Sequence, residues 1–232
     1  MSNRRPSLLA LERAIRGVGQ VAATECPQPH LSQRSEAQLW ETLVSCVLGS
    51  ATTYEDAQSA MRRLRGGALL DAWAVSQDQA RLVEDTTARL RARSIGDRVY
   101  RFPETRSGWL ASAAVTIYGR NDSLSAVLAA CGDAFAARRF LSSSVRGLGP
   151  KQASLFLRNV GASDDLAVID RHVLRYMYWV GLVDSVAPPS SLLSYERLED
   201  LLRRQASVVG LPLGLFDIAV WVVMRTAREV AA

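Results

Sequence analysis

The residue with the most distinctive chemistry in this chain is Lys151, the single lysine among 28 lysine and arginine residues. A guanidinium does not readily lose its proton, whereas a lysine amine can do so and act as a nucleophile. The residues before it are Gly147, Leu148, Gly149 and Pro150, and two glycines at this spacing allow a tight turn with positive φ. Because proline favours the first helical position, we expect a helix that begins at Pro150 and carries Lys151 as its second residue.

The same turn could also bind an anion. The first N–H groups of a helix and the positive end of its dipole attract a phosphate, and glycines leave no side chain in its way. The dipole also disfavours an ammonium at Lys151, which favours the neutral amine that nucleophilic chemistry needs. The plain alternative is an ordinary helical hairpin with a glycine turn.

A second residue with chemical potential is Asp170, which follows the apolar run Leu166–Ile169 and heads a predicted helix that ends near Val180. A carboxylate at a helix N-cap is kept ionised by backbone donors and by the dipole. Such a carboxylate can stabilise positive charge that develops on a sugar ring. Asp170 alone could be only a cap, but its pairing with the Lys151 turn favours a catalytic role.

Helical patterns run through most of the chain and must position these two residues. Three capping boxes are predicted to open helices: Ser35 with Gln38, Thr52 with Glu55, and Ser76 with Gln79. Further helices are expected at about 104–118, 124–130, 134–141, 194–209 and 213–230. Alternating strand patterns are nearly absent, so we predict an all-α fold of around ten helices, with loose segments at 23–33 and 187–193.

Composition narrows the class of protein. A chain of 232 residues can bury a real core in one or two lobes, and its charge of +5 suits an anionic partner such as nucleic acid. The three cysteines, Cys26, Cys46 and Cys131, are scattered, so we expect neither a disulfide framework nor a metal site. The apolar runs are too short for a signal peptide or a membrane span, which predicts a cytoplasmic protein.

Residues 142–175 resemble the helix-hairpin-helix, Gly/Pro-rich loop, Asp (HhH-GPD) superfamily of DNA glycosylases. Within it, residues 151–161 and 169–173 are similar to the archaeal-type 8-oxoguanine DNA glycosylase/AP lyases. Residues 100–106 resemble the Arg-Phe-x-x-x-Arg stretch of that family, and residues 43–52 its early helix and DNA-inserted loop. The resemblance implies a two-lobed fold with the active-site cleft between the lobes. Lobe 1 would span about 36–161, and lobe 2 about 1–35 with 162–232.

The resemblance also implies a mechanism. Lys151 would attack C1′ of the damaged nucleotide and expel the base, and the resulting Schiff base would permit strand cleavage by β-elimination. Asp170 would stabilise the oxocarbenium-like state, while Gly147, Gly149 and His172 would contact DNA phosphates. No metal or cofactor is expected. The expected partner is double-stranded DNA with a damaged or modified base, bound by a monomer associated with the nucleoid.

Two further groups of residues are expected to contact the DNA. On the last predicted helix, Asp217 and Trp221 are one turn apart, so one could accept hydrogen bonds from a purine edge while the other stacks on it. Phe216 is a weaker stacking candidate, and Trp221 could instead belong to the apolar stripe of its helix. Ser50 and Thr52 are expected in the DNA-inserted loop, although this loop differs from the usual Thr-Ala-Asn of the subgroup.

Three functions are compatible with this sequence. The first is a lysine-dependent glycosylase and lyase that acts on 8-oxoguanine. The second keeps that mechanism but removes another modified or oxidised base; the iron–sulfur cysteine cluster of endonuclease III-like relatives is absent from the sequence, which weighs against that branch. The third is a non-catalytic helix-hairpin-helix DNA-binding protein, which would leave the pairing of Lys151 with Asp170 without a reason.

Overall fold

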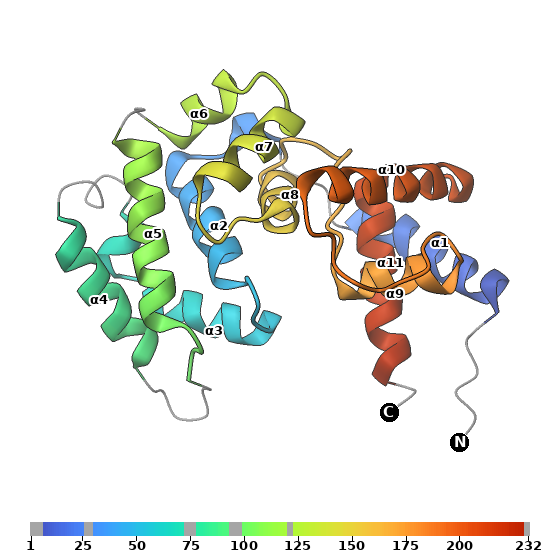
Figure 1. Ribbon diagram of the computed structural model, residues 1–232, viewed down its shortest axis with the longest axis horizontal. Coiled ribbons are helices and arrows are strands. Elements are labelled where there is room, and N and C mark those ends of the chain that lie inside the picture. Colours follow the sequence, from blue (N-terminus) through green and yellow to red (C-terminus); the bar gives the residue numbers. More distant parts are fainter. Residues whose placement is uncertain (1–6, 26–29, 72–77, 93–98, 120–122, 230–232) are drawn as a thin grey trace. The chain divides into compact units, whose positions relative to one another are not determined.

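A computed structural model describes residues 7–25, 30–71, 78–92, 99–119 and 123–229 (Figure 1). All regular elements within these ranges are helices, eleven α-helices and two short 3-10 helices, which confirms the all-α prediction. The α-helices are α1 (Leu8–Glu25), α2 (Glu36–Leu48), α3 (Tyr54–Leu64), α4 (Gln79–Arg91), α5 (Pro103–Tyr118), α6 (Leu124–Ala130), α7 (Ala134–Ser144), α8 (Pro150–Asn159), α9 (Arg171–Trp179), α10 (Leu192–Val209) and α11 (Leu213–Glu229). The 3-10 helices are η1 (Leu31–Gln33) and η2 (Ala68–Leu70).

The chain divides into two compact units. Unit 1 joins the two ends of the chain, Met1–Pro29 and Gly161–Ala232, and contains α1 and α9–α11. Unit 2 is the continuous stretch His30–Val160 and contains α2–α8. Unit 2 therefore begins at His30, whereas the predicted lobe begins at about residue 36.

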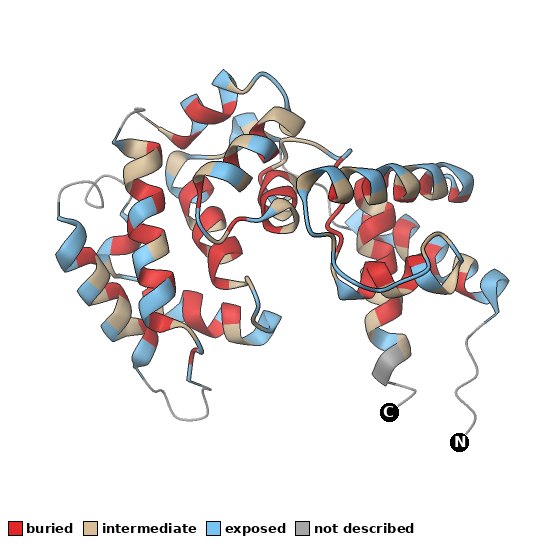
Figure 2. Cartoon of the chain, viewed as in Figure 1, coloured by how far each residue is buried: buried red, intermediate tan, exposed pale blue. Residues whose placement is uncertain are grey.

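Helix α2 is the centre of unit 2. Its residues are buried on most sides, and it contacts α3, α5, α6 and α8 (Figure 2). The largest of its side chains, Trp40, is fully buried, and its indole N–H donates to the carbonyl of Leu69 at 2.6 Å. Because a buried indole N–H needs an acceptor, this bond fixes η2 against α2 and completes the core.

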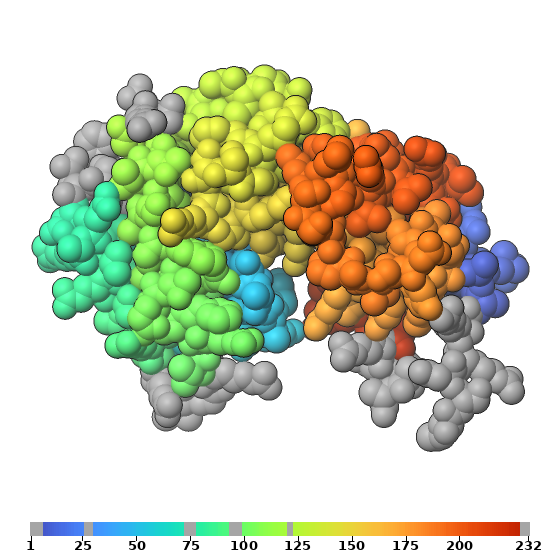
Figure 3. Space-filling model, in the orientation of Figure 1, coloured from blue at the N-terminus to red at the C-terminus, as the bar shows by residue number. Residues whose placement is uncertain are grey.

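The core of unit 1 forms around α11, which packs against α1, α9 and α10. The buried cluster joins Leu11 and Ile15 of α1 to Met177 of α9 and to Val220 and Met224 of α11. Helix α10 lies on the surface of this unit (Figure 3), and buried residues recur along it between exposed ones (Figure 2). This packing holds the start of α9, where Asp170 lies.

The helix starts test the capping predictions. The Ser35–Gln38 capping box at α2 is confirmed. At α3 the cap is Thr53, not the predicted Thr52, and its side chain accepts from the N–H of Asp56. The Thr52 hydroxyl instead donates to the carbonyl of Leu48 at 2.8 Å, so the predicted box was wrong by one residue.

Other helix boundaries correct the sequence expectations. Asp78 caps α4, whereas the predicted cap, Ser76, lies outside the described residues. Helix α10 begins at Leu192 with a capping box on Ser191, two residues earlier than expected. The predicted loose segment 23–33 contains the end of α1 and all of η1, and its residues 26–29 lie outside the described ranges.

No single helix among the described residues is long and apolar enough to cross a membrane. Helices α10 and α11 together reach the required length and hydropathy, but the chain bends by 90° between them.

Candidate functional site

The turn between α7 and α8 contains two glycines, and only Gly147 is in a position that requires glycine. Gly147 has a φ of +90°, and a Cβ added to it would lie 2.7 Å from the Trp109 ring. The N–H of Leu148 donates to the carbonyl of Val145 at 3.1 Å and closes the turn. Gly149 has a φ of −66°, so the positive φ predicted for the turn belongs to Gly147. A Cβ on Gly149 would meet nothing within 4 Å, which leaves the start of α8 open to a ligand.

Helix α8 begins at Pro150, as predicted, and Lys151 is its second residue. The N-cap, Gly149, has no side chain to satisfy the first N–H groups of the helix, so these donors remain available to an anion. The Lys151 side chain is partly exposed. The start of α8 therefore combines an amine with open backbone donors.

A second potential nucleophile close enough to interact electrostatically with Lys151 is Cys46, which is buried on α2. Burial raises the pKa of its thiol to about 12, although the charges of Lys151 and Arg158 lower it. A thiol with so high a pKa stays protonated near neutral pH and is a poor nucleophile. Of these two groups, Lys151 is therefore the better candidate nucleophile.

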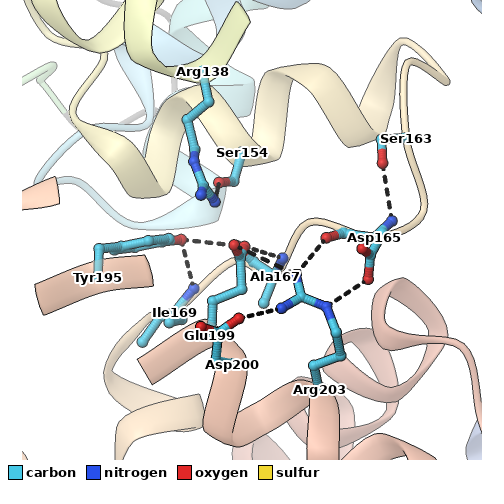
Figure 4. A network of polar contacts seen from close by, with 10 residues as sticks. All are labelled: Arg138, Ser154, Ser163, Asp165, Ala167, Ile169, Tyr195, Glu199, Asp200 and Arg203. Atoms are coloured by element: carbon cyan, nitrogen blue, oxygen red, sulfur yellow. Dashed lines mark hydrogen bonds and ion pairs between the residues drawn. The ribbon is translucent and has the colours of Figure 1, made fainter. Parts of the chain in front are cut away.

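Buried contacts fix α8 in unit 2. Ser154 is fully buried, and its hydroxyl accepts from Nη1 of the buried Arg138 at 3.3 Å (Figure 4). Phe156 is also fully buried. At the end of the helix, Nη2 of Arg34 donates to the carbonyl of Asn159 at 3.1 Å. These contacts give the amine at the start of the helix a rigid base.

The loop after α2, residues 49–53, contains both residues predicted to enter DNA, Ser50 and Thr52. Ala51 between them is exposed and has a φ of +58°, a conformation that costs a non-glycine residue about 1–2 kcal/mol. Strain of this size persists only where the surroundings impose it. Two side chains from outside the loop do so: Nη2 of Arg106 donates to the Ser50 carbonyl at 2.6 Å, and the Tyr100 hydroxyl donates to the Leu48 carbonyl at 2.7 Å.

Arg106 is almost fully buried, which is unusual for a cation. Its guanidinium lies 5.1 Å from the Phe102 ring centre and 4.2 Å from that of Trp109. Trp109 is also the ring that Gly147 approaches. The strained loop and the glycine turn therefore share one wall, built from α5.

Asp170 is the N-cap of α9, as predicted. Its Oδ1 accepts from the N–H groups of His172 and Val173 at 2.8 and 2.9 Å. Within the described residues, Oδ2 receives no hydrogen bond. The carboxylate is partly exposed, whereas the segment Leu166–Ile169 before it is buried. Asp170 thus has one oxygen committed to the helix and one available for a developing positive charge.

The rings of His172 and Trp221 meet edge to face, with centroids 6.5 Å apart. His172 is only 7% exposed, which leaves little of its side chain accessible to a phosphate. Its phosphate contact stays a prediction. Trp221 is partly exposed, and the Arg225 guanidinium lies 5.1 Å from its ring. The indole therefore keeps some surface for a flat ligand.

The other two residues predicted for a base pocket are buried. Phe216 is fully buried in the core of unit 1, where its ring packs edge to face on Tyr176; stacking a base on it would require the core to open. Asp217 is 2% exposed, and its Oδ2 accepts from the N–H of Val168 at 3.0 Å. Its acceptor capacity is thus at least partly used by the backbone.

The sequence-predicted residues divide between the two units. Unit 2 contains the amine, the glycine turn and the strained loop, whereas unit 1 contains Asp170, His172 and the candidate base-pocket residues. Sequence reasoning missed the roles of Arg106 and Tyr100. The spacing of Phe102, Arg106 and Trp109, four and three residues apart, is a signal for a cation between rings on one helix face. No cluster of metal ligands occurs within the described residues.

Comparison with known proteins agrees with this architecture. Residues 28–211 match the family described as 8-oxoguanine DNA glycosylase. A relative named 8-oxoguanine DNA glycosylase/AP lyase from Metallosphaera sedula is 32% identical over 192 residues, which cover 82% of this chain and 84% of the relative. A relative with the same name from Thermotoga maritima is 40% identical over 94 residues, which cover 40% of this chain. The matched region spans only 45% of that relative's length.

Two solved structures have the same fold. The 8-oxoguanine DNA glycosylase of Methanocaldococcus jannaschii has a TM-score of 0.72 and 24% identity, with 92% of each chain covered. That of Thermotoga maritima has a TM-score of 0.68 and 27% identity, and covers 92% of this chain and 95% of its own. Because the family match covers residues 28–211, which include all of unit 2 and both α9 and α10 of unit 1, the chain belongs to the 8-oxoguanine DNA glycosylase family.

Proposed function

We propose that this protein removes 8-oxoguanine from DNA and then cleaves the strand as an AP lyase. The observation that carries the proposal is the position of Lys151, the single lysine of the chain, beside the open backbone donors at the start of α8. Several relatives are named 8-oxoguanine DNA glycosylase/AP lyase. The M. jannaschii enzyme has been solved with a DNA 15-mer that contains 8-oxoguanine.

In the proposed reaction, the neutral amine of Lys151 attacks C1′ of the damaged nucleotide. A bond forms between Nζ and C1′, while the bond from C1′ to the base breaks and its electron pair leaves with the base. Positive charge builds up on the sugar ring as the base departs, and the ionised Asp170 stabilises it. The N–H groups of His172 and Val173 hold its Oδ1 in place.

The covalent intermediate explains the lyase activity. Loss of a proton from Nζ and opening of the sugar ring give a Schiff base between Lys151 and C1′. The Schiff base acidifies the C2′ proton, and removal of that proton expels the 3′-phosphate by β-elimination. No metal or cofactor takes part in this sequence of steps. The lysine is released when water hydrolyses the Schiff base.

The remaining residues would bind the substrate. The target base must leave the helical stack, at a cost of roughly a few kcal/mol. The turn at Gly147 and Gly149 would bind a phosphate beside it, and His172 would contact another. The loop with Ser50 and Thr52 would enter the space that the base leaves.

A pocket on unit 1 would receive the extruded base. Trp221 is partly exposed and could stack on it. Phe216 and Asp217, which are buried on the same helix, would support the pocket. We also expect the protein to act as a monomer on double-stranded DNA in the nucleoid.

Borohydride trapping tests the proposal. The protein is incubated with duplexes that each contain one lesion, 8-oxoguanine or an oxidised pyrimidine, and borohydride reduces the Schiff base to a stable protein–DNA adduct. We expect an adduct with 8-oxoguanine DNA. Lys151→Arg should abolish it while DNA affinity remains within about threefold, because the charge is kept and the nucleophile is lost.

Each contrary result has its own meaning. Trapping only on the pyrimidine lesion would show that the proposed base is wrong but the mechanism right. DNA binding without any trapping or cleavage would favour the non-catalytic binding protein. An undiminished adduct with Lys151→Arg would exclude Lys151 as the nucleophile, since no other lysine could replace it.

A further inference from the structure

The segment before Asp170, residues 165–169, runs alongside α10 without a neighbouring strand. Residues 166–169 are buried, so their backbone N–H groups cannot bond to water. Three consecutive amides instead bond to side chains. The N–H groups of Ala167 and Ile169 donate to side chains of α10, and that of Val168 donates to a side chain of α11.

Three residues of α10 bind this segment at regular intervals (Figure 4). Tyr195 accepts from the Ile169 N–H at 3.0 Å and donates to the Ala167 carbonyl at 2.8 Å. Glu199 accepts from the Ala167 N–H at 2.8 Å. Arg203 donates to the Asp165 carboxylate at 2.8 Å and to the Asp165 carbonyl at 3.1 Å.

The geometry of helix and extended chain explains this regularity. Four residues of an α-helix rise about 6.0 Å, and two residues of an extended chain rise about 6.6 Å. Side chains at 195, 199 and 203 lie on one face of α10 and can therefore bind backbone positions 169, 167 and 165 in turn. The alternation of an extended chain directs the intervening Val168 N–H to the other side, where it meets Asp217 at 3.0 Å.

We infer that this hydrogen-bond ladder positions the catalytic carboxylate, and that Tyr195 is the positioning residue nearest to it. The inference rests on the proposed role of Asp170. Tyr195 bonds to residue 169, which immediately precedes Asp170, so its hydroxyl fixes the point from which the carboxylate extends. Asp217 has the same kind of role at Val168.

Side-chain acceptors from two helices hold this segment in the way that a neighbouring strand would in a sheet. They fix three successive amides from two helices, so neither a shift along α10 nor a rotation about the segment is possible without losing bonds. Misplacing a catalytic group by about 1 Å can cost a hundredfold in rate. Loss of the Tyr195 hydroxyl should therefore affect base release more than DNA binding.

The test measures single-turnover base release from a duplex that contains 8-oxoguanine, together with DNA affinity and melting temperature. Tyr195→Phe removes the hydroxyl and keeps the ring. We expect base release to slow ten- to hundredfold while DNA affinity changes by less than about threefold. Glu199→Gln keeps an acceptor for the Ala167 N–H and should slow base release only two- to threefold.

A double-mutant cycle separates positioning from general destabilisation. If Tyr195 acts through Asp170, adding Tyr195→Phe to Asp170→Asn should slow base release no further. Tyr118→Phe is the matched control, because it removes a hydroxyl that donates to Glu36 in unit 2 at 2.8 Å. It should lower the melting temperature and leave base release unchanged.

Three results would overturn the inference: unchanged base release in folded Tyr195→Phe, a full multiplicative loss in the double variant, or an equal loss in Tyr118→Phe. Unchanged base release in Asp170→Asn alone would instead remove the catalytic role of Asp170, and with it the proposed function of that residue. If Tyr195→Phe does not fold at the assay temperature, Glu199→Ala, which removes the acceptor of the Ala167 N–H, takes its place in the cycle, and a loss that persists in full beside Asp170→Asn overturns the inference.

Discussion

Replacing Gly147 with alanine should disable the turn that presents Lys151. The residue has a φ of +90°, which costs an L-residue about 1–2 kcal/mol. The new methyl group would lie 2.7 Å from the Trp109 ring, and overpacking of this kind costs about 1–3 kcal/mol. We therefore expect Gly147→Ala to lower the free energy of unfolding of unit 2 by about 2–5 kcal/mol, measured by urea denaturation, and to weaken borohydride trapping even where the variant remains folded.

Gly149→Ala is the matched control for stability. Its φ of −66° is open to alanine, and its Cβ would meet nothing within 4 Å. Alanine is a poorer N-cap than glycine but restricts the unfolded chain more, and these effects oppose each other. The free energy of unfolding should stay within about 1 kcal/mol of the wild type. Equal destabilisation by the two substitutions would refute the conclusion that only Gly147 needs glycine.

Two further predictions concern unit 2. Arg106→Met removes the bond to the Ser50 carbonyl, worth about 1.5–3 kcal/mol for a charged donor, so amide hydrogen exchange at residues 49–53 should accelerate at least tenfold; unchanged exchange would show that the loop does not need Arg106. Burial raises the pKa of both Cys46 and Tyr100 to about 12, from 9.0 and 10.0, so the folded state retains these protons more tightly than the unfolded one. The stability that these two protonated groups contribute is complete below about pH 9 and is lost as the pH rises towards 12. Urea titrations should therefore give a lower free energy of unfolding at pH 10.5 than at pH 7. An unchanged or higher free energy at pH 10.5 would contradict this prediction.

Local signals carried much of the fold. Ser35 with Gln38, Pro150 and Asp170 are each found at the helix start that the sequence predicts. Caps and N-terminal prolines act through the backbone of their own turn, so a few neighbouring residues suffice to identify them. The all-α class followed from the same evidence, because the helical periodicity recurs from one cap to the next.

One helix cap was predicted at the wrong residue, because its neighbour could make the same local contact. Thr52 and Thr53 both precede a suitable helix start, and the structure assigns the cap to Thr53 because the Thr52 hydroxyl bonds back to α2. Asp217 was expected to face a ligand, yet one of its oxygens binds the Val168 amide. That bond joins residues 49 positions apart, and no local pattern encodes such a contact.

Unit 1 is built from two segments that are far apart in the sequence, and this affects the order in which the two units can fold during synthesis. The apolar face of α1, with Leu11 and Ile15, packs against α11, which begins about two hundred residues later at Leu213. During synthesis, that face has no partner from α11 until Leu213–Glu229 has left the ribosome, by which time every segment of unit 2 has already emerged. Closing so long a loop is also slow. The apolar face of α1 would therefore stay without this partner while α2 to α10 are made, so unit 1 would complete its core only after all of unit 2 is available to fold.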